Sequence, residues 1–297
     1  LSLLQVNQLT QIVSNDIASN DNNILYIKLI IGIIVATIVS FVIFGGLKRI
    51  ANVASKLVPF MVFIYLLCGI FIIIINIDSI PSVFSLIFNG AFNENSLYGG
   101  IVGVMVIGFQ RAAFSNEAGV GSASIAHSAA KTKEPISEGI VALLEPFIDT
   151  VVVCTMTALV LIFTGFAENN QGLEGAELTS AAFAHALGGW SKMVLAFSAV
   201  LFAFSTMISW SYYGLKSWTY LFGNSKLSDY SYKSVFLLFI IVGSSSTLGA
   251  VIDFSDMMIL GMAFPNIFAL YFFAREVKGD LKEYFRKIKS GEIKTFK

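Results

Sequence analysis

This sequence has few charged residues. Only 13% of its 297 residues are charged, whereas 56% are hydrophobic and the mean hydropathy is +0.78. Soluble domains carry about a quarter charged residues. Acidic and basic residues balance at a net charge of zero, so nothing in the overall charge indicates a nucleic acid as a partner. The composition predicts an all-α polytopic membrane protein that lies in the lipid bilayer.

Cysteine and histidine are also scarce, with two residues of each. Cys68 and Cys154 fall in apolar runs, where buried thiols are the simpler interpretation than a disulfide or a metal site. His127 and His185 lie near predicted loops and form no metal-binding motif. Neither Gly-x-Gly-Asp nor His-Glu-x-x-His occurs, which excludes the usual intramembrane proteases. We therefore expect no enzyme activity and no cofactor.

The start of the chain has no signal-peptide character. The first residue is Leu1, and residues 7–23 contain no basic side chain. A secretory signal needs a basic region ahead of its apolar core. We expect a chain that begins in this way to be a piece of a longer protein, with further spans upstream.

Seven apolar runs are long enough to cross a membrane, for which roughly 20 residues suffice. They are Tyr26–Phe44, Leu57–Ile77, Gly99–Ala130, Ile140–Gly165, Trp190–Trp210, Ser234–Ala250 and Asp256–Ala274. Polar residues interrupt the third run. The segment Ile80–Phe92 is too short to cross, so we expect a surface or re-entrant helix there.

The loops between these runs alternate in charge. Lys48–Lys56, His127–Lys133, Lys216–Lys233 and the tail from Arg275 are basic, whereas Asp16–Asp21, Asp78–Glu94 and Glu168–Glu177 carry carboxylates and no lysine or arginine. The positive-inside rule predicts a multi-pass protein of the plasma (inner) membrane that starts outside and ends in the cytoplasm. The tail, residues 275–297, is either an ordinary basic tail or an amphipathic surface helix.

A charged residue near the middle of a span costs about 2.5–3.5 kcal/mol unless it meets a partner or a cavity. The candidates are Arg111, Glu117, Glu145 and Asp149. Glu145 and Asp149 are four residues apart and share one helix face. Pro146 between them removes a backbone donor, which predicts a local irregularity. Arg111 is expected to form an ion pair with this acidic face. Alternatively, one of the acids takes part directly in ion coupling.

The interrupted run contains the most unusual segment, Phe114–Ser122, which reads Phe-Ser-Asn-Glu-Ala-Gly-Val-Gly-Ser. Gly119 and Gly121 permit backbone conformations that other residues resist. Irregular backbone at membrane depth survives only beside protein or a water-filled cavity. Two half-helices that meet there present carbonyls to a cation and N–H groups to a carboxylate. The segment is therefore either a binding site for a zwitterion or a glycine kink that serves packing.

A third polar group of residues lies in the fifth run. Ser205 and Ser209 share a helix face, with Thr206 beside them and Ser211 nearby. Three hydroxyl oxygens suit a hard cation such as sodium. Serine and threonine in spans also commonly bond to carbonyls of their own helix, so both interpretations stay open.

These segments resemble a known family, the alanine or glycine:cation symporters. Phe114–Thr132 is similar to the family signature, except that Ser124 replaces its usual proline. The resemblance extends over Lys48–Phe60, Glu145–Gly165, Phe204–Gly214 and Met262–Pro265. It implies uptake of a small neutral amino acid, alanine or glycine, driven by Na⁺ or H⁺, by alternating access.

The resemblance also implies a leucine-transporter-type inverted-repeat fold. Residues 1–98 then end the first repeat, 99–274 form the second, and 275–297 are the cytoplasmic tail. By resemblance, the substrate contacts are Phe114, Ser115, Asn116, Glu117, Ala118, Gly119, Gly121, Gln5 and Asn7. Ser205, Thr206 and Ser209 would lie where such folds place a sodium ion. The residues do not distinguish alanine from glycine or sodium from proton.

One alternative belongs to another class. Seven spans with an outside start and an inside end also fit a seven-span receptor or photoreceptor. The last run has no lysine for a retinal Schiff base, and a span broken by glycines is unexpected in such proteins. We therefore favour the symporter.

Overall fold

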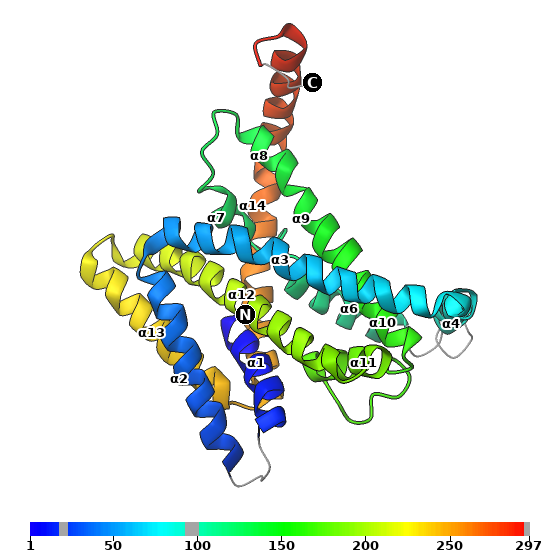
Figure 1. Ribbon diagram of the computed structural model, residues 1–297. Helices are drawn as coiled ribbons and strands as arrows, with labels where there is room; N and C mark the ends of the chain where they lie inside the picture. Colours follow the sequence, from blue (N-terminus) through cyan, green and yellow to red (C-terminus); the bar gives the residue numbers. More distant parts are fainter. Residues whose placement is uncertain (18–22, 93–100, 294–297) are drawn as a thin grey trace. The chain divides into compact units, whose positions relative to one another are not determined.

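The computed structural model describes residues 1–17, 23–92 and 101–293, and within these ranges its regular elements are all helical (Figure 1). They are α1 (Ser2–Ile17), α2 (Ile24–Ile43), α3 (Gly46–Ile75), η2 (Ile77–Ser79), α4 (Ile80–Phe92), α6 (Ile101–Ser115), α7 (Ser122–His127), α8 (Pro135–Ala142), α9 (Leu144–Pro146), η3 (Phe147–Cys154), α10 (Thr155–Phe163), α11 (Gly175–Leu187), α12 (Trp190–Phe222), α13 (Lys226–Ser245) and α14 (Leu248–Ser290). The predicted all-α class is confirmed.

The apolar runs largely become the helices that were expected. Among the described residues, five helical stretches are long and apolar enough to cross a membrane: α2, α3, residues 135–163, α12 and α14. Each coincides with a predicted span. The sixth run forms the second half of α13, whose first half is polar. The interrupted run forms α6 and α7 with residues 116–121 between them, and its predicted start at Gly99 lies outside the described residues.

Three helical segments were not expected as such. The polar start of the chain forms α1, and α11 begins within the predicted acidic loop Glu168–Glu177 and continues to Leu187. The basic tail continues the last span without interruption, so that α14 runs from Leu248 to Ser290 (Figure 1). The tail was predicted to be either an ordinary basic tail or an amphipathic surface helix, and neither description includes a continuation of the span. By contrast, α4 matches the predicted short helix residue for residue.

The chain divides into two compact units, which are described separately. Unit 1 contains Leu1–Val104 and Val153–Ser255, and unit 2 contains Met105–Val152 and Asp256–Lys297. The repeat boundaries expected at residues 98 and 274 come from the family resemblance and stay a prediction.

Unit 1 is a bundle in which α2 lies along α13 and α3 lies along α12 (Figure 1). Small residues allow the first pair to approach closely, because a Cβ added to Gly32 would lie 2.2 Å from Ser244 Oγ and 2.7 Å from Ser244 Cβ. Without a hydrophobic driving force in lipid, such close backbone packing holds spans together. Around α3, α10, α11 and α12, a core includes Tyr65, Val160 and Phe183.

Replacing Gly32 with leucine is therefore expected to weaken the contact between α2 and α13. Overpacking of a well-filled interface typically costs about 1–3 kcal/mol. The measurement is the thermal unfolding midpoint of the detergent-solubilised protein. Gly261→Leu is the matched control, because a Cβ at Gly261 meets nothing within 4 Å. Equal midpoints for the two variants would contradict this account of the packing.

Candidate functional site

The break in unit 2 consists of residues 116–121, between the end of α6 and the start of α7. Gly119 and Gly121 have φ angles of +89° and +109°, in the left-handed region that favours glycine. The Asn116 side chain stabilises the turn, because its Oδ1 accepts a hydrogen bond of 2.8 Å from the Ala118 backbone N–H. The glycines predicted to permit irregular backbone thus do so in the structure.

Two buried polar atoms at the break have no hydrogen-bond partner among the described residues. They are Asn116 Nδ2 and Ser122 Oγ, and Ser122 is fully buried. A buried polar group without a partner costs free energy, and most native groups avoid it. Both atoms can donate a hydrogen bond to an anionic group. The break therefore provides two hydrogen-bond donors that have no acceptor in the described part of the chain and are available to a ligand.

Helix α14 contacts the break through a residue that the sequence analysis missed. Asn266 Nδ2 donates a hydrogen bond of 2.9 Å to the carbonyl oxygen of Gly119. A Cβ added to Gly121 would lie 3.3 Å from Asn266 Cβ. Asn266 directly follows Met262–Pro265, the last segment of the family resemblance. A polar residue next to that segment was the sequence feature that could have indicated a role for it.

Of the two acids in the predicted fourth span, Asp149 contacts a residue that precedes the break, and Glu145 lies near a residue that follows it. Asp149 accepts a hydrogen bond from the hydroxyl of Ser115, the last residue of α6. Glu145 Oε2 lies 3.6 Å from His127 Nε2, at the end of α7. The irregularity predicted around Pro146 is confirmed, because the π-helix η3 begins at the next residue.

Arg111 does not pair with these acids, so the predicted ion pair was wrong. Its guanidinium Nη2 lies 2.6 Å from Asp256 Oδ2 on α14. The guanidinium carbon Cζ lies over the ring of Phe114, 4.9 Å from the ring centroid. Asp149 is engaged by Ser115 instead. The sequence places Arg111 near Glu145 and Asp149 only by chain order, whereas packing brings Asp256 to it from 145 residues away.

His127 is held between two carboxylates rather than standing alone. Its Nδ1 lies 2.8 Å from Glu138 Oε1, and Glu145 faces its other ring nitrogen. Among the described residues no cluster of histidine, cysteine and acidic side chains is suited to a metal ion. Beyond α7, Glu134 forms an ion pair of 3.0 Å with Lys287 of α14 and raises the pKa of that lysine.

The other residues predicted to contact substrate in unit 2 belong to the same stretch of chain as the break. Phe114 and Glu117 are half-buried, whereas Ala118 is exposed. The carbonyl oxygen of Glu117 accepts a hydrogen bond of 3.1 Å from the Val120 N–H, which closes the turn ahead of Gly121. Phe114, Ser115, Asn116, Glu117, Ala118, Gly119 and Gly121 are thus one continuous segment.

Gln5 and Asn7 lie on α1 in unit 1. The Asn7 side chain is buried, and its Nδ2 donates hydrogen bonds to the carbonyl oxygens of Gly243 (2.9 Å) and Ser246 (2.7 Å). These carbonyls belong to the end of α13, where the helix leaves acceptors without intrahelical partners. Asn7 therefore has a packing role, and its predicted contact with substrate stays a prediction. Gln5 is half-buried on the same helix.

The three hydroxyl residues of α12 differ from one another. Ser205 is buried, and its Oγ donates a hydrogen bond of 2.9 Å to the Phe202 carbonyl of its own helix. The hydroxyls of Thr206 and Ser209, both half-buried, make no hydrogen bond within the described part of the chain. Thr206 and Ser209 are thus the stronger candidates for cation ligands, and the predicted role of Ser205 as a third ligand stays a prediction.

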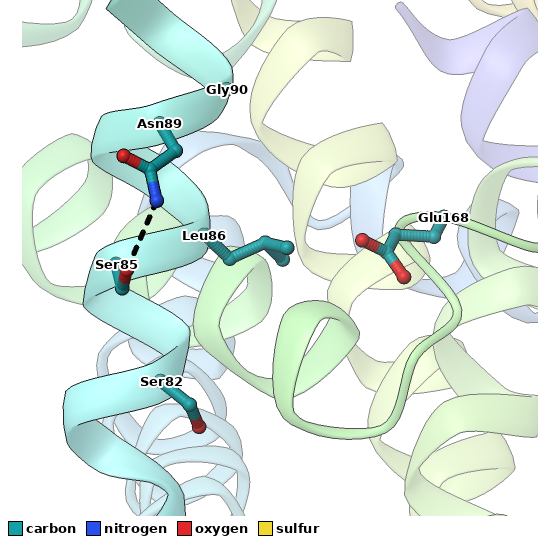
Figure 2. Close-up of a pocket in the computed structure, with 6 residues that line it drawn as sticks. All are labelled: Ser82, Ser85, Leu86, Asn89, Gly90 and Glu168. Carbon is teal, nitrogen blue, oxygen red and sulfur yellow. Dashed lines mark hydrogen bonds between the residues drawn. The ribbon is translucent and has the colours of Figure 1, made fainter.

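A surface pocket of about 640 Å³ lies in unit 1 between α4 and the loop after α10 (Figure 2). The α4 residues Ser82, Ser85, Leu86, Asn89 and Gly90 line one side, and Glu168 faces them across the pocket. All six are exposed, and Asn89 Nδ2 donates a hydrogen bond of 3.1 Å to Ser85 Oγ. None of the predicted site residues lines this pocket.

Comparison with known proteins identifies the family. The chain is 38% identical to an uncharacterized transporter from Haemophilus influenzae over 88% of its length, and 37% identical to the sodium/alanine symporter AgcS from Methanococcus maripaludis over 90%. These alignments span 58% and 59% of the two relatives, so the chain covers less than two thirds of their length. It is 33% identical to a sodium/proton-dependent alanine carrier protein from Bacillus sp. strain PS3, over 95% of this chain and 67% of that protein. The model of the sodium:alanine symporter family matches residues 1–297, and the chain therefore belongs to this family.

Proposed function

We propose that the protein is a secondary transporter that couples the uptake of a small neutral amino acid, alanine or glycine, to sodium entry by alternating access. The observation that carries the proposal is the glycine break of residues 116–121, where the buried donors Asn116 Nδ2 and Ser122 Oγ have no partner among the described residues. The names of the relatives, a sodium/alanine symporter and a sodium/proton-dependent alanine carrier, support the same substrate class. Family membership makes the chain a transport protein rather than an enzyme and gives the receptor alternative no support.

The proposed architecture is the leucine-transporter-type inverted repeat, with the second repeat over residues 99–274. In this proposal the protein lies in the plasma membrane with residues 275–297 in the cytoplasm. The excess of basic residues in that tail supports this orientation.

In the proposed site, a zwitterionic ligand lies against the break. Asn116 Nδ2 and Ser122 Oγ donate hydrogen bonds to its carboxylate, because both are buried and have no partner among the described residues. The carbonyls at the end of α6 face its positive group, as the negative end of a helix dipole favours a cation. Residues 114–122 are thus the proposed substrate contacts in unit 2.

Sodium is the proposed coupling ion, with the Thr206 and Ser209 hydroxyls among its ligands. Hard cations of this kind prefer oxygen ligands. A proton is the alternative, because Asp149 of η3 accepts a hydrogen bond from Ser115, the last residue of α6. A carboxyl group at that position can carry a proton next to the break.

The test of the proposed function is uptake by the complete protein in liposomes. We expect radiolabelled alanine or glycine to accumulate with an inward sodium gradient and not when sodium is equal on both sides. A proton gradient, applied separately with sodium equal on both sides, distinguishes the two ions. Accumulation with no cation gradient would overturn the proposal.

Thr206→Ala is expected to raise the sodium concentration for half-maximal uptake about fivefold, which corresponds to about 1 kcal/mol of lost ion affinity. Ser205→Ala is the matched control on the same helix, because that hydroxyl already bonds to the Phe202 carbonyl. Sodium titration of the initial uptake rate makes the comparison. If both variants kept the wild-type sodium dependence, the hydroxyl site would not bind the coupling ion.

A further inference from the structure

We propose that Asn266 is a positioning residue for the substrate site, which fixes the geometry of the break through the Gly119 carbonyl. This inference rests on the proposed function, since it concerns the same break. Asn266 belongs to α14 and reaches the break from 147 residues away in the sequence. It is not one of the residues that the family resemblance suggested as a substrate contact.

The hydrogen bond from Asn266 acts where the backbone is least regular. Gly119 and Gly121 both have positive φ angles, so the helical hydrogen-bond pattern is interrupted between them. The Gly119 carbonyl receives its bond from Asn266 Nδ2 at 2.9 Å. A backbone with two left-handed glycines has more accessible conformations than a helix. A side chain that satisfies the carbonyl between them selects one of these conformations.

Packing supports the same role. A Cβ at Gly121 would lie 3.3 Å from Asn266 Cβ and 3.5 Å from its Oδ1, so the asparagine lies directly against the second glycine. Asn266 therefore contacts both left-handed residues of the break. Ser122, whose buried hydroxyl has no partner among the described residues, is the next residue in the chain. A shift of the Gly119–Gly121 backbone would move that donor as well.

Among the described residues, helix α14 also makes polar contacts with other helices and loops of unit 2 at Asp256 and Lys287, and these provide the controls. Asp256 pairs with Arg111 ahead of the break, and Lys287 pairs with Glu134 beyond α7. All three contacts attach α14 to residues 111–134. Of these three contacts, the one made by Asn266 is at the break itself. A residue that merely attaches α14 should thus behave like Lys287, whereas a positioning residue should change substrate affinity.

The experiment compares Asn266→Ala and Asn266→Asp with Lys287→Ala in the complete protein reconstituted in liposomes. Each variant's KM for alanine and its maximal rate are measured under one sodium gradient. We expect both Asn266 variants to raise KM by about 10- to 100-fold, as misplacement of a preorganised site does, with the maximal rate changed less than KM. Lys287→Ala should leave KM close to the wild-type value.

The outcomes separate this inference from the proposed function. If the wild-type protein shows no sodium-driven uptake, the proposed function fails. If the wild-type protein transports alanine and the Asn266 variants keep its KM, only the positioning role fails. A lower maximal rate in these variants would not rescue that role. Should Asn266→Ala not accumulate in the membrane, Asn266→Asp tests the same point, because it keeps the size of the side chain and removes the donor.

Discussion

Replacing Gly121 with valine is expected to abolish alanine uptake while the protein still reaches the membrane. The φ angle of +109° lies in the left-handed region, which costs an L-residue about 1–2 kcal/mol and a β-branched residue more. The new Cβ would also press on Asn266 at 3.3 Å. Both effects act at the proposed substrate contact, so we expect the uptake rate to fall by at least about tenfold, the factor that 1.4 kcal/mol represents.

The matched control for this prediction is Gly108→Val on α6. Gly108 is helical, and a Cβ at that position meets nothing within 4 Å. Initial uptake rates are normalised to the amount of each variant in the membrane fraction. Wild-type transport by Gly121→Val would mean that the break serves packing alone. A loss as large for Gly108→Val would mean that α6 tolerates no added side chain anywhere.

Asp256→Ala is expected to destabilise the protein by leaving the Arg111 guanidinium without its carboxylate at 2.6 Å. An unpaired charge at mid-membrane costs about 2.5–3.5 kcal/mol on insertion scales. The Arg111 side chain is 44% exposed, so we expect a smaller loss of about 1–3 kcal/mol of unfolding free energy. The thermal unfolding midpoint in detergent measures the effect.

The control for this pair is the double variant Arg111→Met with Asp256→Leu. Replacing both charges by apolar side chains of similar size is often neutral or stabilising, whereas removal of one partner leaves the other uncompensated. We therefore expect the double variant to unfold closer to the wild type than Asp256→Ala does. A double variant at least as unstable as Asp256→Ala would show that the two residues do not stabilise one another.

The sequence predicted the helical spans well because the signal for a span is local. A run of roughly 20 apolar residues is sufficient to define a membrane helix, whatever it packs against. The break was visible for a similar reason, since two glycines in a polar stretch interrupt an apolar run. Helix α1 was not recognised because polar residues are mixed with the apolar ones on its buried face. Asn7 and Thr10 are buried there by bonding to carbonyls at the end of α13, more than 230 residues away.

The partners of the site residues were beyond what the sequence shows. Chain order suggested that Arg111 pairs with Glu145 or Asp149, whereas its partner is Asp256. Asn266 adjoins a segment of the family resemblance, but the sequence did not indicate that its partner is Gly119. Side-chain partners depend on which helices pack together and at what rotation, and hydrophobic periodicity leaves both undetermined when most helix faces are apolar.

The sequence by itself thus determined the membrane class, the positions of the main spans, the short helix α4 and the glycine break, because each depends on residues that are close in the chain. The tertiary structure alone decided which side chains surround the break. Asn266 bonds to Gly119, Asp149 accepts from Ser115, and Asp256 pairs with Arg111. Each of these contacts joins segments that are at least 34 residues apart in the sequence, so only tertiary packing can bring its two groups within hydrogen-bonding distance.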